Sequence, residues 1–183
     1  IQGRLSEYIK LRTDTQESRV EVNAVLKQDG SVAISNNHIG ISLVNIEEEK
    51  HGKDPARPAS QQDGRFIQSN PEVNLYSYLL FSAHFSDYKE SLKALSHVIM
   101  FFQGRHVFER ARFASLEAPV ERLVFELQSL SLEQLNHLWG TIGGKYMPSV
   151  VYKMKMLVFS DGQPLQTSHP VKEINIHASG VMK

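Results

Sequence analysis

The sequence has no cysteine, no net charge and no long apolar run. Among its 183 residues, 20 Lys and Arg balance 20 Asp and Glu, so no global field favours binding of nucleic acid or of an anionic membrane. The absence of cysteine excludes disulfides, thiolate catalysis and zinc sites built on sulfur, and it is compatible with a cytosolic origin. No apolar stretch approaches the roughly 20 residues that span a bilayer.

The first residues also lack the apolar block of a signal peptide. Because the chain opens on Ile1 rather than Met, we expect a few residues to precede it in the full product. Hydrophobic residues make up 41% and charged residues 22% of the chain, close to the average for folded proteins. A domain of this size buries roughly 70% of the surface that its unfolded chain would expose. We therefore expect residues 1–183 to form one α+β domain.

Apolar periodicity predicts helices and strands mixed along the chain. It predicts helices over residues 2–12 (an N-terminal helix within 1–14), 86–104 and 131–142, with strands over 19–26, 38–49, 72–85, 120–130 and 149–159 and a turn at 28–31. Both faces of the strand over 72–85 are apolar, so we expect it to be central and covered on both sides. The connection over 51–65 is nearly free of apolar residues, and we expect a long loop that is mobile or ordered only by a neighbouring molecule.

The two longer helices have recognisable ends. Asp87 and Glu90 can form a capping box at the start of one, and Gly104 is expected to stop it. Ser131 and Gln134 can form a capping box at the start of the other. The residues expected to face the core are Tyr88, Leu92, Leu95, Ile99 and Phe102 in the first helix, and Leu132, Leu135, Leu138, Trp139 and Ile142 in the second.

The stretch Gly143-Gly144-Lys145 raises the question of a phosphate-binding loop. A Walker loop requires G-x-x-x-x-G-K-[ST] between a strand and a following helix, whereas here a helix precedes the glycines and a strand follows them. In addition, Trp139 stands where the first glycine belongs, and Tyr146 replaces the Ser or Thr. We interpret the two glycines as a left-handed cap that ends the helix.

Histidine and serine residues do not form a recognisable catalytic arrangement. On a strand, Ser82 and His84 point to the same side about 7 Å apart, too far for a direct hydrogen bond. The sequence has no G-x-S-x-G elbow, no H-E-x-x-H motif and no D-x-D-x-D calcium loop. Glu133 and His137, at i and i+4, are more often a solvated ion pair than part of a metal site. A small hydrolase or transferase that uses His84 or His137 is the alternative from another class, and a cleft with strongly shifted pKa values would favour it.

Three stretches together resemble a known family. They are SLVNIEEEK, then NPEVNLYSYLLFSAHFSDYKESLKALSHVIMFFQG, and then LVFELQSLSLEQLNHLWGTIGGKYMPSVVYKMKML, and their order and spacing hold from about Arg19 to Phe159. They are similar to the tail-cap, or tail-terminator, proteins of extracellular contractile injection systems. These systems are phage-tail-like particles of the antifeeding-prophage and virulence-cassette type.

The resemblance implies a phage tail-terminator-like fold: α+β, with a mixed, largely antiparallel sheet flanked by helices. It implies a structural protein, with no catalytic residue, cofactor or metal. The implied role is a homohexameric ring on the distal end of the inner tube and sheath, which ends their polymerisation and anchors the sheath. The implied partners are further copies of the chain, the inner tube protein, the sheath protein and a second cap protein.

The same resemblance leaves the exact place in the particle open. Some relatives have a longer C-terminal extension, so the chain can instead be a cap adaptor or a baseplate component. In each case it would assemble in the bacterial cytoplasm and then belong to a contractile particle that is released or anchored to the cell.

A ring contact needs two complementary patches. The acidic strand end and the basic, aromatic segment KYMPSVVYKMK could supply them, although ordinary surface charge explains any single residue equally well, since exposed ion pairs contribute only about 0–1 kcal/mol. In the C-terminal arm, residues 160–183, the alternating VKEINIH could add a strand to a neighbour's sheet. The candidate interface residues are Glu47, Glu48, Glu49, Lys145, Tyr146, Tyr152, Lys153, Ile174 and Ile176.

Overall fold

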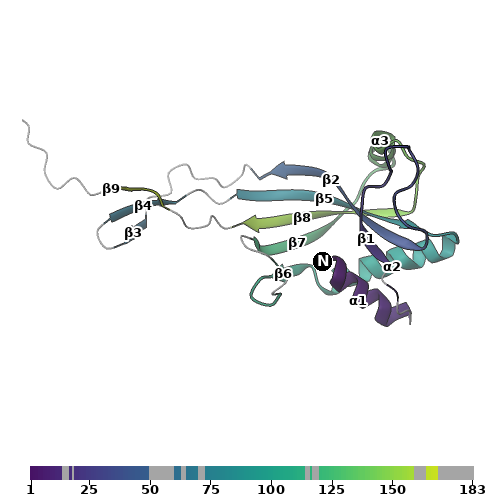
Figure 1. The fold of residues 1–183 in the computed structure, drawn as a ribbon, viewed down its shortest axis with the longest axis horizontal. Coiled ribbons are helices and arrows are strands. Elements are labelled where there is room, and N and C mark those ends of the chain that lie inside the picture. Colours follow the sequence, from purple (N-terminus) through teal and green to yellow (C-terminus); the bar gives the residue numbers. More distant parts are fainter. Residues whose placement is uncertain are drawn as a thin grey trace, which may run out of the picture.

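The computed structural model describes residues 1–13, 17, 19–49, 60–62, 65–69, 73–113, 116, 120–158 and 164–168. Helices and strands are mixed along these residues, as predicted (Figure 1). The helices are α1 (Gln2–Thr13), α2 (Tyr88–Gly104) and α3 (Leu132–Ile142). The strands are β1 (Val20–Val22), β2 (His38–Glu48), β3 (Ser60–Gln62), β4 (Arg65–Ser69), β5 (Val73–His84), β6 (Val107–Glu109), β7 (Val120–Gln128), β8 (Ser149–Val158) and β9 (Pro164–Ser168).

Six strands form the main sheet, in the order β1-β2-β5-β8-β7-β6. β1 runs parallel to β2, and every other neighbouring pair in this sheet is antiparallel. The register pairs Ile41 of β2 with Phe81 of β5, and Phe81 in turn with Val150 of β8. β5 is therefore a central strand, and the mixed, largely antiparallel sheet implied by the resemblance is confirmed.

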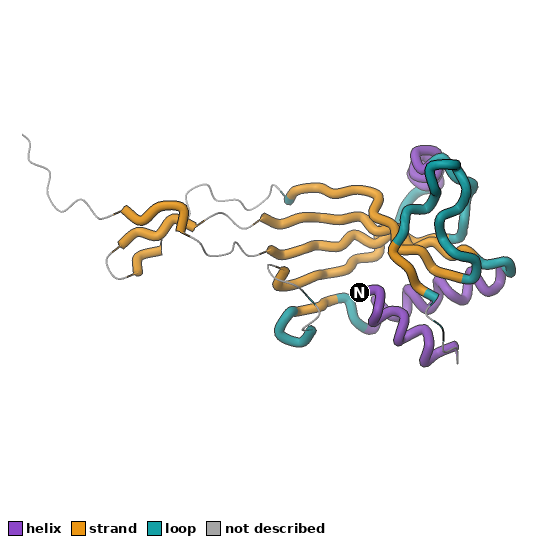
Figure 2. Tube along the Cα trace, viewed as in Figure 1, coloured by secondary structure: helices purple, strands orange, loops and turns teal. Residues whose placement is uncertain are grey.

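β3, β4 and β9 form a separate three-stranded sheet. β4 is its middle strand and pairs antiparallel with both neighbours. This sheet lies beyond the end at which β2 and β8 stop, away from the helices (Figures 1 and 2). Ser60–Gln62 form a strand inside the connection expected over residues 51–65, so the expectation of a loop is wrong there because β4 offers those residues a pairing edge. Residues 51–59, 63 and 64 lie outside the described part.

The strand predicted over residues 19–26 is only three residues long, Val20–Val22. Beyond it, Leu26 pairs with Val32 in an isolated antiparallel bridge. The turn between them contains Gly30 at a φ of 79°, and Asp29 accepts hydrogen bonds from the backbone N–H and the hydroxyl of Ser31. The predicted turn at 28–31 is therefore confirmed, while the strand ends early.

An aromatic core fills the space between the main sheet and the helices α1 and α2. The ring centroid of Phe102 in α2 lies 4.6 Å from that of Phe125 and 4.5 Å from that of Tyr152. Phe81 of β5 approaches Phe102 and Tyr152 edge-on, at 5.3 and 5.5 Å. All four rings are buried. Large buried rings remove much apolar area from water, so this cluster is a major source of hydrophobic stabilisation.

The stripe that α2 buries differs from the predicted one. Tyr88 and Leu92, expected in the core, are 63% and 45% exposed. Apolar residues occupy more than one side of this helix, so periodicity alone allows two neighbouring stripes. Packing decides between them, because Phe101 meets Tyr8 of α1 and Phe102 meets the sheet. The buried residues are Ser91, Ala94, Leu95, Val98, Phe101 and Phe102.

The ends of α2 also differ from the expectation. Asp87 caps the helix by accepting a hydrogen bond from the backbone N–H of Lys89 at 2.9 Å, without the capping box expected with Glu90. At the other end, the helix includes Gly104, and the cap residue Arg105 is extended. Gly104 therefore does not provide a left-handed stop. The helix ends in extended backbone at Arg105, because the chain continues directly into β6.

Helix α3 has the predicted ends. Ser131 accepts a hydrogen bond from the backbone N–H of Gln134, whose side chain accepts one from the backbone of Ser131, so the capping box is confirmed. Gly143 follows the helix at a φ of 76°, in the left-handed region. Gly144 is not at positive φ, so one of the two glycines makes the cap. The diglycine ends a helix, as interpreted from the sequence.

α3 covers the face of the sheet opposite to α1 and α2. Its Trp139 is 5% exposed and packs in a second cluster with Leu80 of β5 and Val151 of β8. Leu132, expected in the buried face, is 86% exposed. That expectation is wrong because the packed part of α3 begins one turn later, at Leu135. Below, the two faces of the main sheet are called the α1–α2 face and the α3 face.

Candidate interaction surface

The helices lie around one end of the main sheet, and β2, β5 and β8 extend beyond them at the other end (Figure 2). Exposure rises sharply along β2, from 6% at Ile41 to 56% at Leu43 and 54% at Ile46. The open end of the sheet is defined as residues 43–48 of β2, 75–79 of β5 and 153–156 of β8, which the register places side by side. Another molecule can pack on either face of this open end.

On its α3 face, the open end carries tyrosine, glutamate and lysine side chains that contact one another. The hydroxyl of Tyr78 donates to Glu47 at 3.0 Å, and the hydroxyl of Tyr76 donates to Glu49. Lys155 Nζ lies 2.8 Å from the carboxylate of Glu49. The tyrosines of β5 thus connect the acidic end of β2 with a lysine of β8.

Lys153 adds a cation to this face. Its Nζ lies 3.8 Å from the ring centroid of Tyr76 and 5.7 Å from that of Tyr78. A cation over an aromatic ring contributes about 0.5–1 kcal/mol at an exposed site. The register places Lys153 opposite Glu126 of β7, so acidic side chains flank the lysines on both neighbouring sides. The surface is polar, aromatic and nearly balanced in charge.

Hydrogen bonding to Glu49 shifts two pKa values on this surface. It raises the pKa of Lys155, because the carboxylate favours the charged ammonium. It also raises the pKa of Tyr76, whose hydroxyl needs its proton to donate to Glu49. At neutral pH, Tyr76 and Lys155 therefore both keep their protons and hold Glu49 by donated hydrogen bonds.

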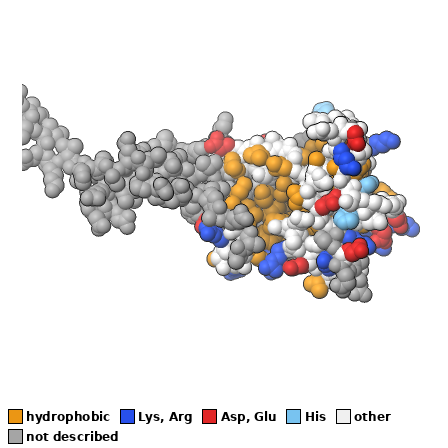
Figure 3. Space-filling model, in the orientation of Figure 1, with side chains coloured by type: hydrophobic (Ala, Val, Ile, Leu, Met, Phe, Trp, Pro, Cys, Tyr) orange, Lys and Arg blue, Asp and Glu red, His pale blue; other side chains and the backbone are white. Residues whose placement is uncertain are grey.

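On its α1–α2 face, the open end is largely apolar, with Ser77 and Glu48 as its polar positions. Leu43 and Ile46 are more than half exposed there, and Leu79 and Met154 next to them are partly buried. Figure 3 shows hydrophobic side chains gathered over β2, β5 and β8 in this part of the molecule. Contiguous exposed apolar area of this kind is typical of a surface that contacts another protein.

The structure brings together some of the predicted interface residues within one chain. Glu47, Glu49 and Lys153 share the α3 face of the open end, and Glu48 is exposed at the end of β2. The acidic strand end and the basic segment were expected to be two separate patches. Because Glu49 pairs with Lys155 in the same chain, part of their charge is already neutralised without a neighbour.

The other predicted interface residues lie elsewhere. Lys145 and Tyr146 are in the loop before β8, and Tyr146 is 58% exposed with its ring 5.7 Å from that of Trp139. Tyr152 is 3% exposed in the aromatic core, so its assignment to an interface is wrong. Alternation along β8 explains the error, since Tyr152 and its neighbour Lys153 point to opposite faces. Ile174 and Ile176 lie outside the described residues.

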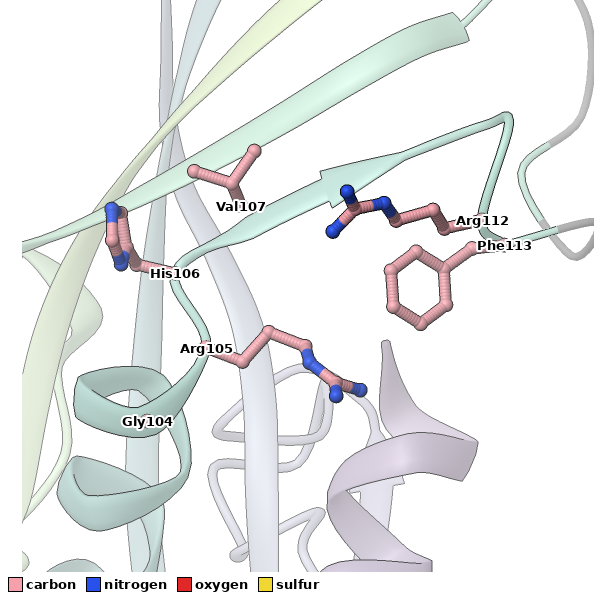
Figure 4. Close-up of a pocket in the computed structure, with 6 residues that line it drawn as sticks. All are labelled: Gly104, Arg105, His106, Val107, Arg112 and Phe113. Carbon is pink, nitrogen blue, oxygen red and sulfur yellow. The ribbon is translucent and has the colours of Figure 1, made fainter.

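A separate pocket of about 470 Å³ lies at the C-terminal end of α2 (Figure 4). Arg105 reaches from the end of the helix toward Phe113, with its guanidinium 5.4 Å from the ring centroid. A positive charge at this position complements the negative end of the helix dipole. Among the described residues, the lining has no carboxylate and consists of Gly104, Arg105, His106, Val107, Arg112 and Phe113.

The two histidines considered as catalytic residues are His84, which contacts the backbone, and His137, which faces solvent. His84 Nδ1 lies 2.8 Å from the carbonyl oxygen of Ile34, and the neighbouring Ser82 is fully buried. His137 is exposed on α3. Within the described part of the chain, no group of three His, Asp or Glu residues is placed to hold a metal ion. None of the helices described is long and apolar enough to cross a membrane.

Comparison with known protein families identifies the family of this chain. Residues 1–173 match the family described as the Pvc16 N-terminal domain. The chain belongs to this family. No curated protein matches it. The match covers all the described elements of the Pvc16 N-terminal domain fold, from α1 to β9, and so includes both sheets.

Two solved structures share the fold of this chain. A PVC sheath/tube terminator of an extracellular contractile injection system, in its extended state, has a TM-score of 0.56 at 15% identity, over 97% of this chain and 63% of the other. The tube-terminating cap of the anti-feeding prophage has a TM-score of 0.50 at 16% identity, over 96% of this chain and 60% of the other. The chain thus spans less than two thirds of the length of either. The resemblance to tail-terminator proteins is confirmed at the level of family and fold.

Proposed function

We propose that this chain is a structural cap, or tail terminator, of a contractile injection system. Two observations carry the proposal: the chain aligns over 97% of its length with a sheath/tube terminator at a TM-score of 0.56, and it belongs to the Pvc16 N-terminal domain family. The role is structural rather than enzymatic, in keeping with the two fold neighbours, which are a terminator and a cap.

In this role, six copies form a ring on the distal end of the inner tube and the sheath. The ring stops the polymerisation of both and anchors the last layer of sheath. A cap needs separate contact surfaces for its neighbours in the ring and for the tube. The open end supports this role, because it presents a polar, aromatic surface on one face of the sheet and a largely apolar surface on the other. Assembly would take place in the bacterial cytoplasm, before the particle is released or anchored to the cell.

The proposal is tested by imaging particles from a producing strain that lacks the gene. We expect tails of uneven length without density at the distal end, and restoration of both by the gene in trans. Particles of normal length with a normal cap would contradict the proposal. Density can instead be lost at the end of the inner tube and kept at the end of the sheath. In that case the chain joins the tube to a second cap protein and does not hold the sheath itself.

A second measurement addresses the ring directly. Light scattering and negative-stain imaging of the purified chain, alone and with the inner tube protein, are expected to show ring oligomers. Monomers under both conditions would contradict the proposed ring.

A further inference from the structure

The pocket at the C-terminal end of α2 contains two arginines that the proposed cap function does not use. Arg105 follows the last turn of α2, and Arg112 lies in the turn after β6. Their guanidinium groups extend into the same space from different sides, and the ring of Phe113 lies beside both (Figure 4). Two separate parts of the chain therefore place a positive charge in one cavity of about 470 Å³.

Both arginines are held by well-packed neighbours. The ring of Phe113 lies 5.2 Å from that of the buried Phe108, and its backbone N–H donates to the carbonyl of Glu109 at 2.9 Å. The backbone N–H of Arg112 donates to the same carbonyl at 3.0 Å. The guanidinium of Arg105 lies over the Phe113 ring, 5.4 Å from its centroid. A guanidinium that stacks on a ring keeps the N–H donors of its planar edge available for a ligand.

These donors are not taken by other side chains within the described part of the chain. Arg112 Nε lies 3.9 Å from the carboxylate of Glu109, which is close enough for an ion pair but too far for a hydrogen bond. The guanidinium of Arg105 has no ion pair and donates no hydrogen bond to a described residue. The pocket thus contains two sets of forked donors that only solvent or a ligand can use.

The charge of the pocket matches an anion with a single charge. Arg105 and Arg112 are partly balanced by Glu109, and Arg4 of α1, the other arginine beside the Phe113 ring, is paired with Glu7 at 3.3 Å. The C-terminal end of α2 adds a partial charge of roughly −0.5, so about one positive charge or less remains. A carboxylate balances this charge, whereas a phosphate group carries about −1.5 to −2 and is bound at helix N-termini rather than C-termini.

We propose that this pocket binds a carboxylate group, which accepts hydrogen bonds from the guanidinium groups of Arg105 and Arg112. The planar fork of a guanidinium matches the two oxygens of a carboxylate. Val107 and the ring of Phe113 provide apolar walls for the carbon atoms that carry the carboxylate. Such a site goes beyond the proposed cap function and does not depend on it. The carboxylate belongs either to a small free molecule or to the end of a protein chain, and the test below separates these two sources.

The test titrates the ¹⁵N-labelled full chain with benzoate at low salt and follows the arginine Nε–H and backbone N–H signals by NMR. Benzamide is the matched probe, because it has the same ring without the charge. We expect saturable shifts at Arg105, Arg112 and Phe113 with benzoate and no shifts with benzamide. Equal shifts with both probes, or shifts with benzoate that do not saturate, would overturn the proposal.

Substitutions at Arg105 separate binding from its position at the end of α2. Arg105→Lys keeps a positive charge at the negative end of the helix, so the melting temperature should not change, but it loses the forked donors and should bind benzoate more weakly. Arg105→Gln and Arg112→Gln should each weaken binding by about tenfold, because each removes a charge-assisted hydrogen bond. A folded Arg105→Gln or Arg112→Gln that binds benzoate as tightly as the wild type would overturn the proposed site.

The matched control is Arg110→Gln. Arg110 lies two residues from Arg112, is not among the residues that line the pocket and is paired with Glu121 at 3.4 Å. This variant removes the same charge from the same turn and should bind benzoate as the wild type does. A loss as large as that in Arg112→Gln would show a general effect of surface charge and would overturn the assignment to the pocket.

Further probes identify the anion and its source. Inorganic phosphate should bind more weakly than benzoate, and tighter binding of phosphate would overturn the assignment to a carboxylate. A short neutral peptide with a free C-terminal carboxylate is compared with its amidated form. Tighter binding of the free-acid peptide than of benzoate would support the site and identify a protein chain end as the source. Binding of benzoate without binding of either peptide would support the site and identify a small free carboxylate. Equal binding of both peptides would overturn the proposal.

Discussion

The two ends of the main sheet contain the same strands but differ in what covers them. At the covered end, Leu80 and Phe81 of β5 point to opposite faces and both are fully buried. At the open end, Leu43 and Ile46 of β2 are more than half exposed. The apolar content of the strands is similar at both ends, so the helices, rather than the strand pattern, determine which end is core. Strand alternation alone therefore identifies surfaces that need a partner but not whether the partner is in the same chain.

The comparison predicts very different costs for shortening side chains at the two ends. Phe102→Ala should lower the free energy of unfolding by about 3–5 kcal/mol, because it removes a ring packed between Phe125 and Tyr152 and leaves a cavity. Ile46→Ala should cost less than about 1 kcal/mol in the isolated chain, since more than half of that side chain is already in water. Urea unfolding of both variants measures the difference. Equal costs would show that the open end is part of the core.

Close packing at the covered end should also make it intolerant of added atoms. Gly40 of β2 lies against the buried Ile34, and an added Cβ would be 2.6 Å from Ile34 Cγ1. Gly40→Ala should therefore destabilise the chain by about 1–3 kcal/mol. The matched control is Gly140→Ala in α3, where the added Cβ meets nothing within 4 Å and should stabilise the helix by about 0.5–1 kcal/mol. A neutral Gly40→Ala in thermal melting would mean that Ile34 can move aside.

The two glycines that follow α3 should differ in how much their substitution lowers the stability of the chain. Gly143→Ala should cost about 1–2 kcal/mol, because a Cβ is disfavoured at a φ of 76°. Gly144→Ala should cost less, since Gly144 is not at positive φ and its Cβ would meet Leu26 side-chain atoms at 3.4 Å. Urea unfolding of the two variants shows which substitution lowers the free energy of unfolding more. ATP binding that exists in the wild type and is lost in Gly143→Ala would instead support a phosphate-binding loop.

The smallest effect is expected at the open end, at alkaline pH. The raised pKa values of Lys155 and Tyr76 mean that the folded state holds these protons more tightly than the unfolded state. Their contribution is complete below the unfolded values of 10.0 for Tyr76 and 10.5 for Lys155, and it is lost as pH rises through the higher folded values. It should be no more than about 1 kcal/mol, because Tyr76 and Lys155 are only half-buried and solvent screens their contacts with Glu49.

The variant Glu49→Gln isolates this contribution, because other lysines and tyrosines titrate equally in both proteins. The melting temperature of the wild type should fall more steeply than that of Glu49→Gln as the pH rises above the unfolded pKa values of 10.0 and 10.5. Parallel curves would show that the network of Glu49 has no energetic role in the isolated chain.

Local signals were sufficient for several predictions. The capping box of Ser131 and the left-handed Gly143 are confirmed, because each depends on residues within one turn of the helix end. The central position of β5 is confirmed, but cover on both sides holds only near Leu80 and Phe81, since residues 75–79 extend beyond the helices. The short strand β6 was missed, since Val107–Glu109 offers only three residues, too few to show a period, and becomes a strand by pairing with β7.

The candidate surface was predicted in part. Glu47 and Glu49 lie at the open end with Lys153 beside them, and their place in an interface stays a prediction. The sequence contained no sign that Tyr76 and Tyr78 would connect them. That connection depends on the register between β2, β5 and β8. Tyr152 was misplaced for a related reason, because a run of mixed apolar and basic residues does not show which alternate positions face the helices.

The sequence by itself determined the types of most elements, the place where α3 stops and the family to which the chain belongs. These depend on periodicity, capping and motif order, which are local or linear properties. Only the tertiary structure decided which stripe of α2 is buried, which face of β8 is core and how far β2 runs beyond the helices. The physical reason is that burial is settled by contacts between segments far apart in the chain: Phe102 reaches Phe125 and Tyr152 only after the sheet has formed, whereas Tyr88 and Leu92, on the same helix, are left in water.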